Sequence, residues 1–176
     1  FVFYPGKAGG AFVKQYEQAG LTDKLPLYTV FTIDSIALPK LQQAKMKAVL
    51  GSLNTQFWGP DLDNPQNHQF VSGFKKKYGR YPSFYAAQSY DSVFLIKSAV
   101  EAVGGNLSDM DGMRAAMEKA DFPSVRGAFS YGKNHFPIQN FYLRKVVEDS
   151  DGNWTTSVID TVLKDHQDTY VGECKI

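Results

Sequence analysis

Residues 1–52 alternate between two hydrophobic patterns, and this alternation restricts the chain to few folds. Apolar, aromatic or β-branched runs at 1–4, 25–32 and 48–52 predict three strands, and the first of them is expected to be buried. Between them, residues 12–19 and 36–41 carry apolar side chains at helical spacing, the second of these helices starting at Asp34-Ser35. The order strand, helix, strand, helix, strand predicts an α/β fold with a parallel sheet and right-handed crossovers.

A glycine-rich loop, Pro5–Gly10, joins the first predicted strand to the first helix. In open α/β sheets, ligands bind beside such loops, at the carboxyl ends of the strands. The loop lacks the dinucleotide-binding fingerprint because Ala8 stands where the second glycine is needed, and it has no P-loop spacing. We therefore expect its backbone N–H groups to face the polar end of a ligand other than a nucleotide phosphate.

The middle of the chain is predicted to be helical. Asn64-Pro65 is typical of a helix start, and Pro82-Ser83 precedes the longest expected helix, 84–103, which Gly104-Gly105 ends. A third helix is expected after Ser108-x-x-Asp111, which resembles a capping box. Its Met stripe predicts a buried face, at Met110, Met113 and Met117.

The last part of the chain is rich in predicted strands. Strands are expected over 127–131, 139–147 and 154–158, and the tail from 163 is expected to be irregular. Asp151-Gly152 indicates a hairpin turn between the last two strands. A calcium loop at 149–160 is the weaker interpretation, because its glycine falls two places early and Asp160 stands where glutamate is needed.

Composition and charge exclude several classes of function. The net charge is +1, and the one basic run, Lys75–Lys77, suits the end of a helix, so no nucleic-acid partner is expected. The single cysteine, Cys174, allows no intrachain disulfide. Aromatic residues make up 14% of the chain, which suits a packed core and also a pocket that stacks planar ligands.

The residues that usually carry catalysis are scattered. His68, His135 and His166 form no metal-binding pair, and the sequence has no G-x-S-x-G motif. We expect no catalytic residue, metal or cofactor, and therefore a protein that is not an enzyme. The chain also begins within a predicted strand, without Met or a signal peptide, which indicates a fragment or a processed product.

Four segments together resemble the C-terminal half of the type I periplasmic binding proteins. They are FVFYPGKAGGAFVKQYEQAGL, PLYTVFT, AVLGSLN and LDNPQNHQFVSGFKKKYGRYPSFYAAQSYDSVFLIKSAVEAVGG. The resemblance is to the leucine/isoleucine/valine-binding branch and to its relatives that bind aromatic acids. It implies an α/β fold of two parallel-sheet lobes with a ligand clamped between them. Residues 1–53 and 140–176 then belong to the second lobe, and residues 54–139 complete the first, with crossings at Phe57-Trp58 and Pro137–Gln139.

The resemblance also implies which residues line the cleft. Tyr85 falls where the family places an aromatic residue on the ligand side chain, and the loop Gly6-Lys7-Ala8 matches a family loop that lines the pocket. Amino-acid binders carry an acid where this sequence has Phe31, and Asp34 is the nearest carboxylate. The complete set of expected site residues is Tyr4, Gly6, Lys7, Ala8, Phe31, Asp34, Trp58, Tyr85 and Gln88.

The implied function is that of a periplasmic solute-binding component of an ABC importer, whose partners are a small ligand and a membrane permease. Because Phe31 stands where amino-acid binders carry the acid that pairs with the ligand ammonium, a small aromatic carboxylate is favoured. A buried ammonium without a counter-ion would be costly. A branched-chain or other aliphatic amino acid is the alternative ligand. Two other classes remain open: a ligand-sensing regulator of the same fold, and an α/β enzyme, for which the sequence offers no nucleophile.

Overall fold

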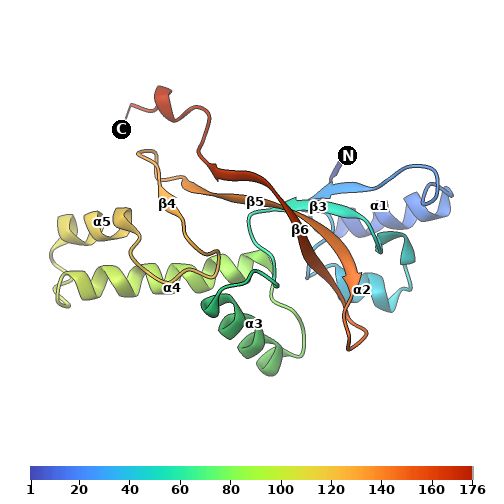
Figure 1. Ribbon diagram of the computed structural model, residues 1–176, viewed down its shortest axis with the longest axis horizontal. Helices are drawn as coiled ribbons and strands as arrows, with labels where there is room; N and C mark the ends of the chain where they lie inside the picture. The colour runs from blue at the N-terminus through green and yellow to red at the C-terminus, as the bar shows by residue number, and fades with distance from the viewer. Residues whose placement is uncertain (176) are drawn as a thin grey trace.

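The computed structural model describes residues 1–175, and it shows an elongated molecule with helices at both ends (Figure 1). Helices α1 (Lys7–Gln18) and α2 (Leu38–Gln43) lie at one end, and α4 (Phe84–Ala102) and α5 (Met110–Lys119) lie at the other. Helix α3 (Pro65–Tyr78) lies between them. The strands are β1 (Val2–Phe3), β2 (Tyr28–Val30), β3 (Leu53–Gln56), β4 (Ser130–Tyr131), β5 (Pro137–Glu148) and β6 (Trp154–His166), with short 3-10 helices η1 (Lys47–Val49) and η2 (Val171–Glu173).

The sheet runs in the order β1-β2-β3-β5-β4, and β6 pairs with β5. Strands β1, β2 and β3 are mutually parallel, which confirms the predicted strand–helix alternation and the α/β class. Strands β4, β3 and β6 each pair with β5 in antiparallel fashion. Strand β5 therefore reaches from the helices at one end of the molecule to those at the other (Figure 1).

Two of the predicted strands differ from the structure. The apolar run 48–52 forms η1 and a turn, and the strand follows it at β3, because Ala48 and Val49 are buried in the core between helices. The run 1–4 does form a strand, but it is not buried. Strand β1 lies at the edge of the sheet, and Phe3 and Tyr4 are 59% and 52% exposed.

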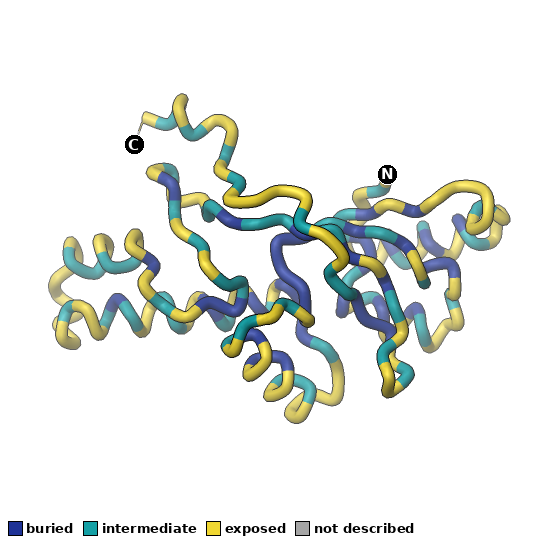
Figure 2. The backbone as a smooth tube through the Cα atoms, viewed as in Figure 1, coloured by how far each residue is buried: buried dark blue, intermediate teal, exposed yellow. Residues whose placement is uncertain are grey.

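Two separate hydrophobic cores hold the molecule together. The first, here called the sheet core, packs α1, α2 and η1 on the sheet and consists of Val13, Tyr16, Leu27, Ile33, Leu38, Leu41, Ala48, Val49, Val146 and Trp154. The second, here called the aromatic core, consists of Phe57, Trp58, Phe70, Val71, Phe84, Ala87 and Val125. Buried segments accordingly gather along the central strands and on the inward sides of the helices (Figure 2).

The predicted helix starts are confirmed for α3 and α4. Asn64 accepts a hydrogen bond from the N–H of Asn67, and Ser83 accepts one from the N–H of Ala86. Helix α5 differs, because its cap is Asp109, which accepts from the N–H of Gly112. The prediction of a buried Met stripe on α5 is wrong. Every residue of this helix is exposed or half-buried, and Met110 is 64% exposed.

A buried ion pair fixes α4 to the segment before β4. The Asp91 carboxylate accepts hydrogen bonds from the Ser124 hydroxyl (2.6 Å), the Val125 N–H (2.9 Å) and the Arg126 Nε (2.9 Å). The side chains of Asp91 and Arg126 are 2% and 7% exposed. Arg126 Nη1 also donates to Gln139 Oε1 at the start of β5, so the network joins three segments of the chain.

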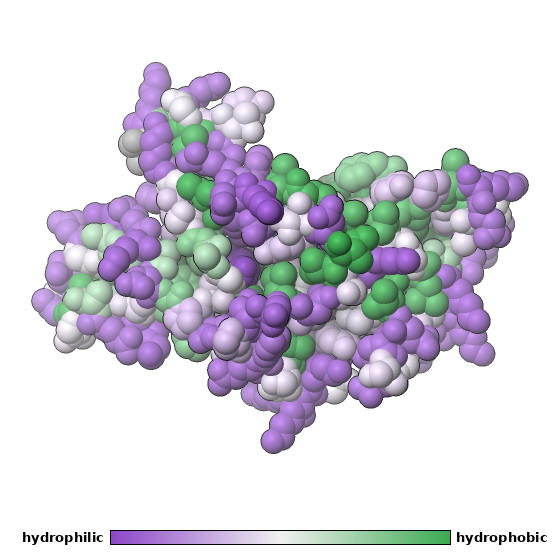
Figure 3. Space-filling view, viewed as in Figure 1, coloured by the Kyte–Doolittle hydropathy of each residue, from purple (hydrophilic) through white to green (hydrophobic). Residues whose placement is uncertain are grey.

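The hairpin predicted at Asp151-Gly152 is confirmed, and β6 runs on to His166, beyond the predicted end. Ile159, Val162 and Leu163 of β6 are 51%, 44% and 45% exposed, and apolar side chains gather over this middle part of the molecule (Figure 3). The register of β5 against β6 shifts between Gln139 and Phe141, again at Tyr142, and once more before Arg144. Among residues 1–175, none of the helices is long and apolar enough to cross a membrane.

Candidate ligand-binding site

A cavity of about 380 Å³ lies where the glycine-rich loop, the segment after β2 and the start of α4 meet. It brings together five of the residues expected from the sequence, Gly6, Lys7, Phe31, Asp34 and Tyr85. Its remaining lining residues are Pro5, Gly10, Thr32, Ile36, Ala37, Lys40 and Leu41. Tyr85 is the one contribution from the α4 side, so the glycine-rich loop and Tyr85 share this cavity.

The loop is held against the end of β2 by close backbone packing. Gly6 is the N-cap of α1 and has φ +73°, a conformation that favours glycine. One turn later, a Cβ at Gly9 would overlap the carbonyl oxygen of Tyr4 and would meet Thr32 at 3.0 Å. The Tyr4 N–H also donates to the Thr32 hydroxyl at 2.9 Å. These contacts place the N-terminus of α1 at the rim of the cavity, where its dipole favours negative charge.

Aromatic rings form one wall of the cavity. Phe31 has φ +54°, in the left-handed region, which bulky side chains rarely adopt. Its ring meets Phe3 edge-on at 6.0 Å and Phe84 at 5.1 Å. Tyr85 lies against Phe84 with ring centroids 4.0 Å apart and stays 51% exposed. Packing on both sides thus holds Phe31 in a strained conformation beside a free tyrosine face.

The charges at the cavity are two lysines and one aspartate. Lys7 and Lys40 are both exposed, and each begins or lies near the start of a helix. Asp34 Oδ1 accepts hydrogen bonds from the N–H groups of Ile36 (2.9 Å) and Ala37 (2.8 Å). The carboxylate of Asp34 therefore already stabilises the turn that leads into α2. The surplus of positive groups, with a helix N-terminus, favours an anionic ligand.

Four expected site residues lie outside this lining. Ala8 and Gln88 are exposed on α1 and α4, and Tyr4 stacks on Phe12 with ring centroids 6.0 Å apart. Trp58 is fully buried in the aromatic core, where its Nε1 donates to Asn67 Oδ1 at 2.8 Å. The sequence pattern could not place Trp58, because a Trp followed by Gly-Pro fits a cleft wall as well as a core.

Sequence reasoning also missed Lys40, Thr32 and Leu41 as lining residues. Lys40 comes to the cavity because the turn closed by Asp34 delays the start of α2 to Leu38. The available signal was the pair Asp34-Ser35 followed by Pro39, which is typical of a turn before a helix.

A buried arginine lies in the central strands. Arg144 is 4% exposed, and its guanidinium donates to Asn54 Oδ1 (2.8 Å) and to the Trp58 carbonyl (2.9 Å). Burial lowers the pKa of Arg144 to about 10, and the negative charges of Asp34 and Asp61 partly offset this effect. Arg144 is therefore charged at neutral pH and joins β5 to β3 and to the segment after it.

Within residues 1–175, no group of three or more histidine, cysteine, aspartate or glutamate side chains is arranged to hold a metal ion. The lining residues themselves offer aromatic faces, ammonium groups and backbone N–H groups. Such a set can bind and orient a small planar anion.

Comparisons with known proteins place the chain in a family. Residues 1–153 match the family described as periplasmic binding protein. A Brucella abortus (strain 2308) protein named Leu/Ile/Val-binding protein homolog 6 is 30% identical over 168 residues, which are 93% of this chain and 42% of the relative.

Solved structures give the same result. An R. palustris ABC-transporter solute-binding protein in complex with benzoate has a TM-score of 0.83 at 31% identity, covering 99% of this chain and 46% of that protein. A solute-binding protein of an ABC transporter from Rhodopseudomonas palustris BisB5, in complex with 3,4-dihydroxy benzoic acid, has a TM-score of 0.81 at 27% identity. The match covers 98% of this chain and 46% of that protein. The chain thus spans less than half the length of these relatives. Since the family match extends over residues 1–153, this chain belongs to the periplasmic binding protein family.

Proposed function

We propose that the protein is the solute-binding component of an ABC importer and binds a small aromatic carboxylate between two lobes. The observation that carries this proposal is the cavity that joins Phe31 and Tyr85 to Lys7 and Lys40. Its volume of about 380 Å³ lies toward the lower end of the range for small-molecule sites, which suits a single-ring ligand. Such a protein works in the periplasm, passes its ligand to a membrane permease and catalyses no reaction.

The aromatic ring of the ligand would lie against Tyr85 and Phe31, and its carboxylate would face the N-terminus of α1 and the two lysines. Offset or edge-to-face pairing of rings contributes about 0.5–1.5 kcal/mol beyond the buried area. The relatives in complex with benzoate and 3,4-dihydroxy benzoic acid support this ligand class.

The two lobes would be residues 1–53 with 140–176, and residues 54–139. The two cores support this division, because all buried members of the sheet core fall in the first set and all those of the aromatic core fall in the second. Ligand contacts from both lobes would favour a closed form that the permease recognises.

A branched-chain amino acid is the second candidate, because the 30% identical relatives carry the name Leu/Ile/Val-binding protein homolog 6. An amino acid brings an ammonium group, for which Asp34 is the one carboxylate in the cavity lining. One oxygen of Asp34 already accepts two backbone hydrogen bonds. This arrangement weakens the case for an ammonium ligand.

Thermal shift and calorimetric titration of the full-length protein distinguish the two candidates. Benzoate and 4-hydroxybenzoate are compared with leucine and valine, each at about 100 times its dissociation constant, where binding adds about 2.7 kcal/mol of stability. Tyr85→Ala should weaken benzoate binding about tenfold or more. Tyr170→Ala, which removes a tyrosine that is 68% exposed in the C-terminal segment, is the control. Stabilisation by leucine or valine alone would refute the aromatic-acid proposal.

A further inference from the structure

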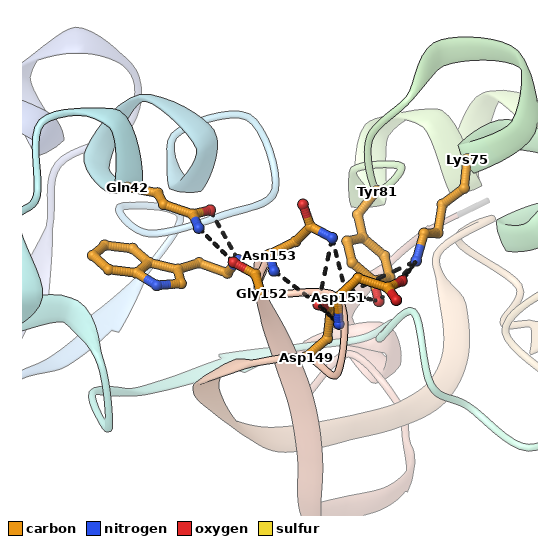
Figure 4. Close-up of polar contacts among 8 residues, drawn as sticks. Gln42, Lys75, Tyr81, Asp149, Asp151, Gly152 and Asn153 are labelled. Atoms are coloured by element: carbon orange, nitrogen blue, oxygen red, sulfur yellow. Dashed lines mark hydrogen bonds and ion pairs between the residues drawn. The ribbon is translucent and has the colours of Figure 1, made fainter.

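The turn between β5 and β6, residues Asp149–Asn153, contacts both proposed lobes at once (Figure 4). On one side Gln42 of α2 holds it: Gln42 Nε2 donates to the Gly152 carbonyl at 2.6 Å, and Gln42 Oε1 accepts from the Trp154 N–H at 3.0 Å. These contacts fix the turn to the helices packed on the sheet core. The turn is thus attached to the lobe that contains the glycine-rich loop.

On its other side the turn meets Lys75 and Tyr81, which belong to the end of α3 and the segment after it (Figure 4). The Tyr81 hydroxyl donates to Asp149 Oδ2 at 2.8 Å and accepts from Lys75 Nζ at 3.3 Å. Lys75 Nζ lies 3.9 Å from carboxylate oxygens of both Asp149 and Asp151, and 4.3 Å from the centre of the Tyr81 ring. Residues 68 positions apart in the chain are therefore joined directly.

The two carboxylate oxygens of Asp149 contact different parts of the molecule. Its Oδ1 accepts from the N–H groups of Asp151 (2.9 Å) and Asn153 (2.8 Å) and so closes the turn, while Oδ2 faces Tyr81. Partial burial opposes ionisation, but the hydrogen bonds from Asn153, Tyr81 and Asp151 outweigh it and hold the pKa of Asp149 below its ordinary 3.8. Asp149 is therefore ionised at neutral pH, and its side chain is 13% exposed.

We propose that Asp149, Tyr81 and Lys75 form a clasp that joins the two lobes. They act as positioning residues for the ligand cavity, because the clasp sets the ratio of closed to open protein in the absence of ligand. The inference rests on the proposed function, since it assigns a role in that site's affinity to residues that lie outside its lining. A closed form that is populated without ligand lowers the free energy that the ligand must supply for closure. Loss of the clasp then weakens binding without removing any ligand contact.

The size of the effect follows from the contacts. Tyr81→Phe removes a hydrogen bond to the charged Asp149 carboxylate. A bond of this kind is strong enough that its loss should reduce the closed-to-open ratio about tenfold. The Lys75 ion pairs are longer and its side chain is 34% exposed, so Lys75→Met should reduce the ratio only about two- to threefold. Because both residues contact Asp149, the double variant should lose less than the product of the two single effects.

The test uses the full-length protein with one spin label in each proposed lobe, at Asp23→Cys and Leu107→Cys, after Cys174 and every other native cysteine have been replaced by serine. Both labelled positions are exposed and lie in loops. Distances between the labels are measured without ligand by double electron–electron resonance, and benzoate affinity is measured by calorimetry. Tyr78→Phe is the matched control, because Tyr78 lies three residues before Tyr81, is 54% exposed and has no hydrogen bond from its hydroxyl within residues 1–175.

We expect Tyr81→Phe to shift the ligand-free distances toward the open form and to weaken benzoate binding by a similar factor, with Tyr78→Phe unchanged. Unchanged distances in Tyr81→Phe, or equal shifts in Tyr78→Phe, would overturn the clasp. If the distances shift as expected but benzoate does not bind the unsubstituted protein, the clasp stands and the proposed ligand is wrong. If benzoate binds all variants equally and the distances shift, the clasp does not set affinity, and the proposal fails in that part.

Discussion

Two neighbouring glycines of α1, Gly9 and Gly10, should respond in opposite directions to the same substitution. Gly9 is buried, and an added Cβ would overlap the Tyr4 carbonyl oxygen and lie 3.0 Å from both Cγ2 and the carbonyl oxygen of Thr32. Two of these three atoms are backbone atoms, which no side-chain rotation can move away. At Gly10 an added Cβ would meet no atom within 4 Å.

The free energies of unfolding follow from these surroundings. Alanine is favoured over glycine inside a helix by about 1 kcal/mol, and overpacking against fixed atoms costs up to about 3 kcal/mol. Gly9→Ala should therefore lose about 2 kcal/mol, whereas Gly10→Ala should gain about 0.5–1 kcal/mol. For a domain of this size the thermal midpoint should fall by about 4–8 °C in the first variant and rise by about 1–4 °C in the second.

Urea and thermal unfolding followed by tryptophan fluorescence would measure both variants, since Trp58 and Trp154 are buried in different cores. The Gly10→Ala variant serves as the control for helix propensity, because it changes the same residue type one position away. Equal midpoints for the two variants would refute the argument that close backbone packing, rather than chain flexibility, requires glycine at position 9.

Three further results are expected. Asp91→Ala leaves the buried guanidinium of Arg126 without its carboxylate and should lower the free energy of unfolding in urea by about 3–5 kcal/mol. Asp111→Ala breaks the exposed ion pair with Arg114 and should lower it by less than about 0.5 kcal/mol. Similar losses in the two variants would contradict the argument that burial sets the cost. Asn64→Ala removes the cap of α3 and should cost about 1 kcal/mol in the same assay, so an unchanged midpoint would argue against that cap. The pKa of Asp149 in the folded protein is below 3.8, so the contribution of its ionised form is complete above that pH and is lost as the pH falls through the lower folded-state value. The stability difference between the wild type and Tyr81→Phe should therefore shrink as the pH falls below 3.8, and a difference that does not change with pH in acid would contradict this.

Local signals in the sequence predicted the features that neighbouring residues decide. The starts of α3 and α4 and the turn after β5 depend on a cap or a glycine within a few positions, so Asn64, Ser83 and Asp151-Gly152 were sufficient. The parallel order of the first three strands was equally clear, because the alternation of short apolar runs and helical periods permits few arrangements.

Features that depend on distant contacts were not predicted. Residues 48–52 carry an apolar run of strand length, and only the packing of Val49 between helices gives it a helical turn. The length of β6 depends on its long pairing with β5, which the local composition after Val158 does not show. Periodicity alone also could not bring Tyr85 to the glycine-rich loop. That expectation came from the family resemblance, and ligand binding by these residues stays a prediction.

Strand β5 has a further consequence for how this protein can be divided. Its first residues pair with β4, while residues from Tyr142 to Lys145 pair with β3, so one continuous strand serves both halves of the molecule. A fusion point or protease cut between Ile138 and Tyr142 would therefore divide the part of β5 that pairs with β4 from the part that pairs with β3. Recombination between homologous proteins should fail within β5, where the register shifts with β6 must be inherited together.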